Sequence, residues 1–331
     1  MVRLSDVAVH AGVSVRTVSN VVNDFRHVAP DTRARVQASI DALGYRPNMA
    51  ARNLRRGRTG LLALVVPEID SPYFSDLAAR TVRIAEAEGW TVLIDQTDGD
   101  PARERSLLHG ERSQLVDGVV FSPWSVPAQE LASRSDATPI VLLGEHEGAP
   151  PVDHVVIDNV RAAEEAVGHL AARGRTAIAA IGVRPTLGNA TAHQRLLGHR
   201  RALAAAGMEQ RPDREAAVGS LHRDEGHRAM TELLDSTEPP DAVFCFSDQL
   251  ALGALRAVVD AGLRVPHDVA VVGFDDIEDG RYSVPRLTTV SPDRDQIATL
   301  ALQVLRARLA GDDTPARVHT AGHRLVVRES S

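Results

Sequence analysis

The first 45 residues contain three short stretches in which apolar residues recur three or four positions apart. This spacing places the apolar side chains on one side of an α-helix. Gly12 separates the first two stretches, Ser14 is a suitable N-cap for the second, and Gly44 is a suitable C-cap for the third. The pattern predicts a helix-turn-helix followed by a third amphipathic helix. The apolar positions are Val7, Ala8 and Ala11 in the first helix, Val18, Val21 and Val22 in the second (Val15 to about Asn23), and Val36, Ile40 and Leu43 in the third (Asp31–Leu43).

From Leu61 onward the pattern changes to short, continuous apolar runs that alternate with amphipathic stretches of helical period. Such alternation is typical of a parallel sheet flanked by helices. The runs occur in two series, so we expect two doubly wound lobes. The second series has strands at Val155–Ile157, Ala177–Ile181, Ala242–Cys245 and Val269–Gly273, with helices at Val160–Arg173, Ala192–Ala206, Arg223–Leu234 and Gln249–Ala261.

Composition limits the class of protein. A chain of 331 residues exceeds the size at which one hydrophobic core stops growing, which indicates two or three domains. No apolar run reaches the roughly 18 residues that a membrane span needs. The N-terminus lacks the apolar stretch of a signal peptide, and the single Cys245 has no second cysteine to pair with. We therefore expect a cytoplasmic protein with no membrane association.

Charge is distributed unevenly along the chain. Residues 1–60 hold ten arginines and four acidic residues, whereas residues 61–331 hold 27 basic and 40 acidic residues. A basic segment attached to an acidic body indicates that nucleic acid is the partner of that segment only. The alternative is a basic arm that is merely exposed to solvent.

Catalytic motifs find little support in the sequence. The chain has no lysine, so it cannot contain a GxxxxGK phosphate loop, and no G-x-S-x-G turn occurs. His319 and His323 have the spacing of two metal ligands, but they fall in a predicted strand region without cysteine partners. We therefore expect a protein that is not an enzyme, with no metal site and no cofactor.

Several strings in the first 54 residues closely resemble the head of the LacI (lactose repressor) family of bacterial transcription regulators. The similarity continues to about residue 328 and so covers nearly the whole chain. One departure is Arg3, where the family usually has a hydroxyl residue that caps the first helix, so we expect that helix to be frayed until DNA binds. The matching strings are Asp6-Val7-Ala8, Ala11-Gly12-Val13-Ser14, Thr17-Val18-Ser19, Gly44-Tyr45-Arg46-Pro47-Asn48 and Ala51-Arg52 with Leu54.

The resemblance implies a role for the second helix, which enters the major groove of DNA in this family. Arginine pairs with guanine, asparagine pairs with adenine, and a valine methyl can contact a thymine methyl. The residues that the resemblance places against base edges are Val15, Arg16 and Asn20, and those that it places against phosphates are Ser14, Thr17, Ser19 and Asn23.

A second DNA contact is implied between the head and the body. The segment that begins at Pro47 is compatible with a helix of about nine residues, which is too short to be stable alone in water. In the family, two such hinge helices pair in the minor groove and an apolar side chain enters a base step. The corresponding residues here are Asn48, Ala51, Arg52 and Leu54. The alternative is a flexible arginine-rich linker.

The resemblance also implies the fold class, which is an N-terminal all-α helix-turn-helix head plus an α/β body of two doubly wound parallel-sheet lobes, periplasmic-binding-protein-like. The chain would cross between the lobes near Asp158, Ser291 and Arg317. The expected divisions are a DNA-binding domain at 1–46, a hinge helix and linker at 47–60, and an effector-binding and dimerisation body at 61–331. The first lobe would hold about 61–158 and 291–316, and the second about 159–290 and 317–331.

Ligands of open parallel sheets bind beyond the carboxyl ends of the strands, and the cleft between two such lobes gathers several strand ends. Aromatic rings there can stack on a sugar or a base, while carboxylates and a guanidinium bind hydroxyl groups. We expect Asp276, next to one of these carboxylates, to be structural. The resemblance implies a polar contact and an aromatic platform after the first strand, and effector contacts at the positions of Arg195, Asp248 and Asp275, while Phe121 and Trp124 end the third strand. The predicted effector-binding residues are therefore Ser71, Tyr73, Phe74, Phe121, Trp124, Arg195, Asp248 and Asp275. Asp248 could equally cap the helix that follows it.

Together these features predict a sequence-specific, DNA-binding transcription regulator, with repressor as the favoured role. It would bind a near-palindromic operator in double-stranded DNA as a homodimer and respond to a small-molecule effector in the cleft. A sugar is the favoured effector, and a nucleoside or purine acting as co-repressor is the alternative. Two readings from other classes remain, namely a sugar-binding transport component and a sugar-converting enzyme with an appended DNA-binding domain.

Overall fold

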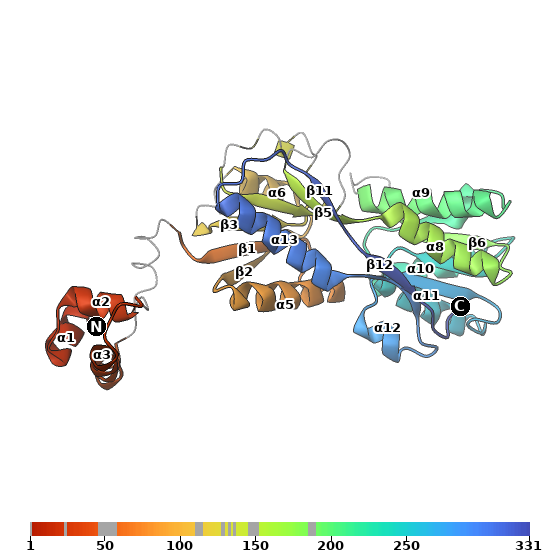
Figure 1. The fold of residues 1–331 in the computed structure, drawn as a ribbon. Coiled ribbons are helices and arrows are strands. Elements are labelled where there is room, and N and C mark those ends of the chain that lie inside the picture. The colour runs from red at the N-terminus through yellow and green to blue at the C-terminus, as the bar shows by residue number, and fades with distance from the viewer. Residues whose placement is uncertain are drawn as a thin grey trace. The chain divides into compact units, whose positions relative to one another are not determined.

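The computed structural model describes residues 2–22, 25–45, 58–109, 115–126, 130–131, 134, 137–144, 152–184 and 190–331. The chain divides into two compact units, Met1–Thr59 and Gly60–Ser331, which we call the head and the body. Figure 1 traces both in chain order, the head being all helical and the body mixed α/β. No helix among the described residues is long and apolar enough to cross a membrane.

The head is built from the three predicted helices, α1 (Leu4–Ala11), α2 (Val15–Val22) and α3 (Pro30–Leu43). Each helix is too short to be stable alone, so a shared core must hold them together. Val7 of α1, Val18 of α2 and Val36 of α3 are all fully buried in that core. The three-helix prediction is therefore confirmed.

Hydrogen bonds at the ends of α1 fix its length. The Asp6 carboxylate accepts a hydrogen bond of 2.8 Å from the backbone N–H of Arg3, which secures the start of the helix without a hydroxyl residue at the cap position. The Asp6 carboxylate thus replaces the missing hydroxyl cap, and fraying of this helix in the absence of DNA stays a prediction. At the other end Gly12 adopts a left-handed conformation with φ of 64°, and the Val13 N–H donates to the Ala8 carbonyl at 3.0 Å. This closes the turn that leads into α2.

The first lobe of the body is a six-stranded sheet in the order β11-β5-β4-β3-β1-β2, in which every strand pair is parallel. Helices α5 and α13 pack together on one face, and α6 covers the other. Its elements are β1 (Leu61–Val66), α5 (Pro72–Ala87), β2 (Thr91–Gln96), α6 (Pro101–Leu108), β3 (Gly118–Phe121), β4 (Ile140–Leu143), β5 (Asp153–Ile157), α13 (Arg294–Leu309) and β11 (Val318–Ala321).

The second lobe repeats the plan in the order β12-β10-β9-β8-β6-β7, and its edge strand β12 runs antiparallel to β10. Helices α8 and α9 pack as one pair, and α10 and α11 pack as another. Its elements are α8 (Asn159–Ala172), β6 (Ile178–Val183), α9 (Ala190–Ala205), the short 3-10 helix η2 (Pro212–Arg214), β7 (Glu215–Ala217), α10 (Arg223–Leu234), β8 (Ala242–Cys245), α11 (Asp248–Asp260), β9 (Ala270–Phe274), α12 (Glu278–Tyr282), β10 (Thr288–Pro292) and β12 (His323–Val326).

The chain passes between the lobes three times. The first two passages lie at Asp158, between β5 and α8, and at Asp293, between β10 and α13. The third lies at Gly322 and not near Arg317 as predicted, because β11 pairs with β5 in the first sheet before the chain enters the second. The first lobe therefore keeps a C-terminal strand that the sequence pattern assigned to the second.

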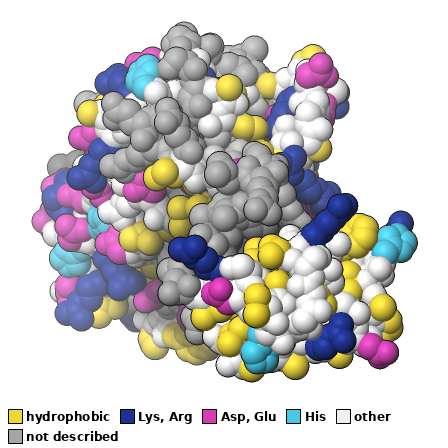
Figure 2. Space-filling model, turned by 90° about the vertical axis from the view of Figure 1, so that its left-hand side faces the viewer, with side chains coloured by type: hydrophobic (Ala, Val, Ile, Leu, Met, Phe, Trp, Pro, Cys, Tyr) yellow, Lys and Arg dark blue, Asp and Glu magenta, His cyan; other side chains and the backbone are white. Residues whose placement is uncertain are grey.

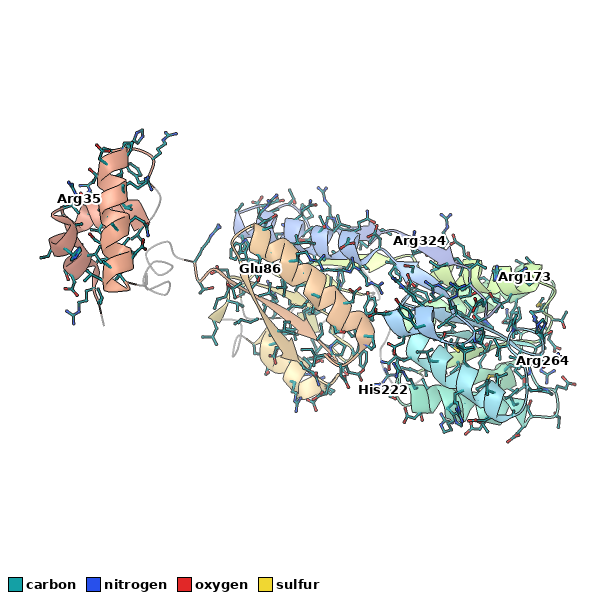
Figure 3. All side chains as sticks on the ribbon, turned by 90° about the horizontal axis from the view of Figure 1, so that it is seen from below. Arg35, Glu86, Arg173, His222, Arg264 and Arg324 are labelled. Atoms are coloured by element: carbon teal, nitrogen blue, oxygen red, sulfur yellow. The ribbon has the colours of Figure 1, made fainter. Side chains whose placement is uncertain are left out.

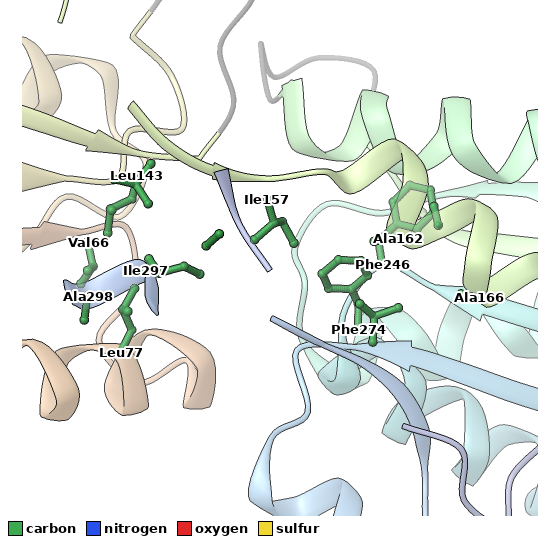
Figure 4. Packing of buried hydrophobic residues seen from close by; sticks show 14 of the residues in the cluster. Val66, Leu77, Leu143, Ile157, Ala162, Ala166, Phe246, Phe274, Ile297 and Ala298 are labelled. Carbon is green, nitrogen blue, oxygen red and sulfur yellow. The ribbon is translucent and has the colours of Figure 1, made fainter. Parts of the chain in front are cut away.

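One hydrophobic cluster runs through both lobes. Figure 4 shows Val66, Leu77 and Ile297 on the first-lobe side and Phe246 and Phe274 on the second-lobe side, all at most 5% exposed. Ile157, which lies just before the first passage, belongs to the same cluster. Leu77, Ile157 and Ile297 of this cluster also line the cleft described below.

Candidate DNA-binding surface and ligand cleft

Helix α2 has one face in the core of the head and another face at the surface. Val18 and Val21 point into the core, whereas Val15 is 47% exposed and Arg16 is exposed as well. A valine exposed beside an arginine gives no packing energy to the head. Two of the three predicted base-contacting side chains thus lie together at the start of the helix, where a duplex could reach them.

Hydroxyl groups surround the N-terminus of the same helix. The Ser14 Oγ accepts a hydrogen bond of 3.1 Å from the backbone N–H of Thr17, which confirms Ser14 as the N-cap. The two hydroxyl oxygens of Ser14 and Thr17 are 2.9 Å apart. Helix N-termini attract anions through their free N–H groups and dipole, so this end of α2 suits a phosphate.

The remaining predicted DNA contacts are less exposed or lie elsewhere. Ser19 and Asn20 are half-buried on α2. Asn23, Asn48, Ala51, Arg52 and Leu54 lie outside the described residues, so the hinge helix stays a prediction. Arg3, Arg26 and Arg35 are exposed on the head, and Figure 3 labels Arg35 on α3.

Surface charge of both signs covers the molecule. On the face drawn in Figure 2, acidic and basic side chains are interspersed, and hydrophobic side chains stand singly or in small groups between them. Many arginines of the body are paired with carboxylates, for example Arg211 with Asp213 and Glu238 at 2.8 and 2.7 Å. Among the described residues, such pairing lowers the positive charge that these arginines present to phosphate.

The body contains a cleft between the carboxyl ends of its two sheets, with a volume of about 130 Å³. First-lobe residues from the ends of β1, β3 and β4 form one wall, and second-lobe residues from α9 and the ends of β8 and β9 form the other. Its polar lining residues are Glu68, Ser71, Tyr73, Ser122, Trp124, Asn159, Thr191, Arg195, Ser247, Gln249 and Asp275.

Three aromatic rings form the first-lobe wall. The Tyr73 and Phe74 ring centroids are 5.1 Å apart at 76°, and the Phe74 and Trp124 centroids are 6.3 Å apart at 59°. Pro72 starts α5 and thereby places Tyr73 and Phe74 in its first turn, beside the strand ends. The first pair meets edge to face and the second is tilted, so neither pair stacks face to face and part of each ring surface is left for a ligand.

Arg195 of α9 is held rigidly in the opposite wall. Its Nε donates to the Asn159 Oδ1 at 2.8 Å, and its Nη1 donates to the Phe246 carbonyl. The guanidinium carbon lies 3.5 Å from the centroid of the Phe274 ring. A guanidinium fixed by three contacts is ready to donate to a ligand at little further entropic cost.

Asp275 reaches the cleft from an unusual backbone conformation. Its φ is 113°, a region that side-chain-bearing residues rarely adopt, and such strain concentrates at functional sites. The Asp275 N–H donates to the Val290 carbonyl at 2.8 Å, and its own carbonyl accepts from Arg294. Burial raises the pKa of the Asp275 carboxyl to about 6, although the Arg195 and Arg294 charges act in the opposite direction.

Two predicted cleft residues do not line the cleft. Phe121 is the last residue of β3 and is fully buried between the sheet and α6, because both faces of a central parallel strand are covered. Asp248 is fully buried below the cleft floor, where it accepts hydrogen bonds from the Ile277 N–H (2.8 Å) and the Thr289 hydroxyl (2.6 Å). Burial holds the pKa of Asp248 well above its usual range. Asp248 also does not cap α11, since Ser247 does.

Other acidic and histidine residues have structural partners. Asp276 accepts from Arg328 at 2.5 Å and from the Ser291 hydroxyl at 3.0 Å, as expected for a structural residue. His319 of β11 faces Asp153, and His323 of β12 faces Glu165, so the two histidines belong to different sheets. The described part of the chain holds no group of three or more residues able to bind a metal ion.

The sequence pattern missed Glu68 and Asn159. Glu68 lies two residues after β1, and Asn159 lies two residues after β5, directly behind the first passage between lobes. Both positions follow the rule that ligands meet the carboxyl ends of strands, so the rule alone could have identified them. Asn159 also orients Arg195, a role that depends on a contact between α8 and α9 and has no local signal.

Comparison with known protein families also distinguishes a head from a body. Residues 3–48 match the family described as bacterial regulatory proteins, lacI family. Residues 167–331 match the family described as periplasmic binding protein-like domain. Over its whole length, the chain is 31% identical to the HTH-type transcriptional repressor PurR of Mannheimia succiniciproducens and 31% identical to catabolite control protein A of Priestia megaterium, covering 98% and 99% of those proteins.

Solved structures of transcription regulators are also similar to this chain over nearly its whole length. The transcriptional regulator CelR in complex with cellobiose is 32% identical, with both chains fully covered and a TM-score of 0.75. The lac repressor dimer bound to operator and the anti-inducer ONPF is 26% identical, with 99% of this chain and 98% of that chain covered and a TM-score of 0.87.

Proposed function

This chain belongs to the lacI family of bacterial regulatory proteins, and we propose that it is a repressor whose effector is a sugar. It is a DNA-binding transcription regulator controlled by a small molecule, and it binds operator DNA as a dimer. The proteins that it resembles are regulators rather than enzymes. We place it in the cytoplasm, where operator DNA is accessible.

The observation that carries the DNA-binding proposal is the exposed N-terminal end of α2. Val15 and Arg16 are exposed there beside the hydroxyls of Ser14 and Thr17, while Val18 anchors the helix in the core. Arg16 would bind a guanine edge and Val15 a thymine methyl, and the hydroxyls would bind phosphates. Ser19, Asn20 and Asn23 complete the proposed contacts.

The hinge is proposed to act in the minor groove. Asn48, Ala51 and Arg52 would contact the groove, and Leu54 would enter the central base step. Unstacking a base step costs a few kcal/mol, which contacts to the kinked duplex offset. Because so short a helix is unstable alone, its formation depends on a second hinge beside it. Pairing of two hinges thereby couples the spacing of the two bodies to DNA affinity.

The effector proposal is supported by Arg195 and Asp275 facing an aromatic wall. A guanidinium donor and a carboxylate acceptor can bind neighbouring hydroxyls of a sugar, while Tyr73, Phe74 and Trp124 provide a surface for its ring. A relative of similar fold has been solved as a CelR–cellobiose complex. A nucleoside or purine acting as co-repressor is the second candidate, because the same rings could stack on a base and one relative of this chain is named the transcriptional repressor PurR.

A salt titration of the full-length protein tests the function. Its affinity for a selected operator should fall with salt with a log–log slope of about −0.9 for each phosphate neutralised, and should exceed its affinity for random duplex by at least about 1,000-fold. A sugar-binding transport component would show no such preference. Equal affinity for all duplexes would refute the proposal.

A thermal-shift screen tests the effector class. Sugars and nucleosides are added to the protein, and a ligand present at 100 times its Kd adds about 2.7 kcal/mol to the stability of the body. Stabilisation by a monosaccharide or glycoside, with none by nucleosides, is the expected result. Stabilisation by nucleosides alone would overturn the sugar assignment while leaving the regulator assignment intact.

A further inference from the structure

A contact between a carboxylate and an imidazole joins the two lobes at the mouth of the cleft. Glu68 follows β1 in the first lobe, and His222 directly precedes α10 in the second. The Glu68 Oε1 and His222 Nε2 atoms are 3.5 Å apart, and 19% and 36% of the two side chains are exposed. Figure 3 shows His222 at the edge of the second lobe that is turned toward the first. This contact can exist only while the lobes are close together.

A second contact joins the lobes beside the first. The guanidinium carbon of Arg184, which follows β6 in the second lobe, lies 5.1 Å from the centroid of the Trp124 ring in the first. The Arg184 Nη2 donates to the Gly219 carbonyl at 3.1 Å. Its Nη1 is buried and has no hydrogen-bond partner among the described residues, which leave the ring of Trp124 as a principal contact of this cation.

The first-lobe side of this contact is rigid. Glu104 of α6 is fully buried, and its carboxylate accepts from the backbone N–H groups of Trp124, Ser125 and Val126 at 2.8 to 2.9 Å. Gly99 packs against the indole, where an added Cβ would lie 3.0 Å from a ring carbon. Trp124 is thus a fixed platform rather than a mobile ring.

The second-lobe side is also set by the backbone. The pairing of β6 with β7 shifts register between Ile181 and Val183, around Gly182 with a φ of 131°. An added Cβ at Gly182 would lie 2.4 Å from the Phe246 Cβ, so only glycine fits this bend. The bend precedes Arg184 by two residues and directs the strand end toward the cleft mouth.

The charges on both sides are complementary. Burial raises the pKa of Glu68, and the neighbouring Asp70 adds to this effect, whereas His222 and Arg184 act to lower it. Both opposing groups belong to the second lobe. Burial likewise lowers the pKa of Arg184, and Glu68 opposes that shift. Each lobe therefore supplies the charge that compensates the other at the cleft mouth.

We propose that Glu68, Trp124, Arg184 and His222 form a clasp that holds the lobes closed and controls how an effector enters and leaves. The proposal rests on the cleft being the effector site. His222 and Arg184 are not among the residues that line the cleft, so they would act on lobe closure and not through direct contact with the bound molecule. The clasp does not include Arg195 and Asp275, which also line the cleft.

The distance between the lobes in the full-length protein tests this clasp without any ligand. Ala102→Cys on α6 and Thr231→Cys on α10 would carry spin labels, since both positions are exposed. Cys245 is fully buried and burial raises the pKa of its thiol, so it should escape labelling. Pulsed electron–electron double resonance then gives the populations of closed and open forms.

His222→Gln and Arg184→Gln should each lower the ratio of closed to open form about twofold to fivefold, the range expected for a partly exposed ion pair. Arg223→Gln is the matched control, because Arg223 pairs with Asp279 within the second lobe at 2.9 Å and is adjacent to His222. The control should leave the distance distribution unchanged.

An unchanged distribution in both clasp variants would overturn the proposal, as would an equal change in Arg223→Gln. If Arg184→Gln fails to fold, as judged by circular dichroism, the result for His222→Gln decides alone. Operator binding is measured on the same samples. Its absence in the wild-type protein would refute the proposed function without affecting the distance result, so the two failures are distinguishable.

Discussion

Asp275 combines backbone strain, a raised pKa and a position in the cleft. A non-glycine residue at a φ of 113° costs about 1 to 3 kcal/mol, and here the Val290 and Arg294 hydrogen bonds maintain it. Its neighbour Asp276 has the opposite character. Burial acts to raise the pKa of Asp276, but hydrogen bonds from Arg328 and Ser291 and the Arg281 charge lower it overall. Of these two adjacent carboxylates, Asp275 thus serves ligand binding and Asp276 serves structure.

This contrast predicts opposite effects of pH on two variants. The folded protein keeps the Asp275 proton up to a pH of about 6, whereas the unfolded chain loses it near 3.8, so the free energy of unfolding falls as pH rises through this window. Asp275→Asn should therefore be more stable than the wild type by about 1 to 2 kcal/mol at pH 8, and by less at pH 4.5. Urea denaturation at both values measures this.

Asp276→Asn is the control, and its effect has the opposite sign. The lowered pKa of Asp276 contributes stability above the unfolded pKa that is lost as pH falls. Its substitution should destabilise the protein at pH 8. A difference between Asp275→Asn and the wild type that does not change with pH would contradict the assignment of a raised pKa.

Arg16 is the residue on which base recognition depends most. Arg16→Ala should weaken operator binding by about 1 to 3 kcal/mol and relax the preference at one symmetric position of each half-site. Quantitative gel shifts with systematically altered operators measure both effects. Arg35→Ala, an exposed arginine on α3, is the control and should not alter the sequence preference. Uniform weakening on all sequences would show that Arg16 contacts phosphate.

At the scale of elements, helix α2 and the proposed hinge helix differ in what stabilises them. Helix α2 is stabilised by the core of the head, through Val18 and Val21, and by the Ser14 cap. The proposed hinge helix lacks such support, since it is too short to be stable alone and Leu54 lies between Arg52-Asn53 and Arg55-Arg56. Helix α2 is therefore folded before DNA binds, whereas the proposed hinge helix forms only with DNA and a second subunit.

Leu54→Ala should reduce DNA bending without changing the stability of the body. The smaller side chain cannot wedge open a base step, so the duplex stays straighter. A circular-permutation gel assay measures the bend, and a urea melt of the body serves as the control. Bending equal to that of the wild type would refute the wedge role of Leu54.

Elements with strong local signals were predictable, and those fixed by distant pairing were not. Strand β8 at Ala242–Cys245 and helix α10 at Arg223–Leu234 match the predicted bounds, because apolar runs and helical periodicity are local. The placement of β11 was wrong, because its membership of the first sheet depends on pairing with β5, more than 150 residues away. Phe121 was misplaced for a related reason, since a strand buried on both faces shows no alternation.

The same limit applies to the cleft. Tyr73, Arg195 and Asp275 were identified correctly as lining residues. Asp248 was not, because the hydrogen bonds that draw it below the floor come from Ile277 and Thr289, which lie 29 and 41 positions away. Strand ends can be located from the sequence, but the direction of each side chain depends on tertiary contacts.

At the scale of the whole molecule, a near-palindromic operator requires a two-fold body. Tyr282 of α12 and Val284, just after it, are 78% and 91% exposed, and apolar side chains this exposed mark interaction sites when they cluster. We expect part of the contact with a second copy of the chain at this segment. The two heads would then be held at a fixed separation.

Tyr282→Asp should therefore shift the protein toward monomers and weaken operator binding by at least about 100-fold, since binding through both half-sites is lost. Sedimentation velocity measures the first effect and gel shifts measure the second. Leu115→Asp, which alters another exposed apolar residue (69% exposed), is the control and should remain a dimer. A dimeric Tyr282→Asp protein would place the contact elsewhere.

The three passages at Asp158, Asp293 and Gly322 have a mechanical consequence. Three connecting segments act together as a hinge that permits only some directions of rotation. One lobe can therefore rotate relative to the other but cannot separate from it. A protease that nicks one passage leaves two intact, and the cut body should stay in one piece on a sizing column. Severing the connection would take cuts at all three.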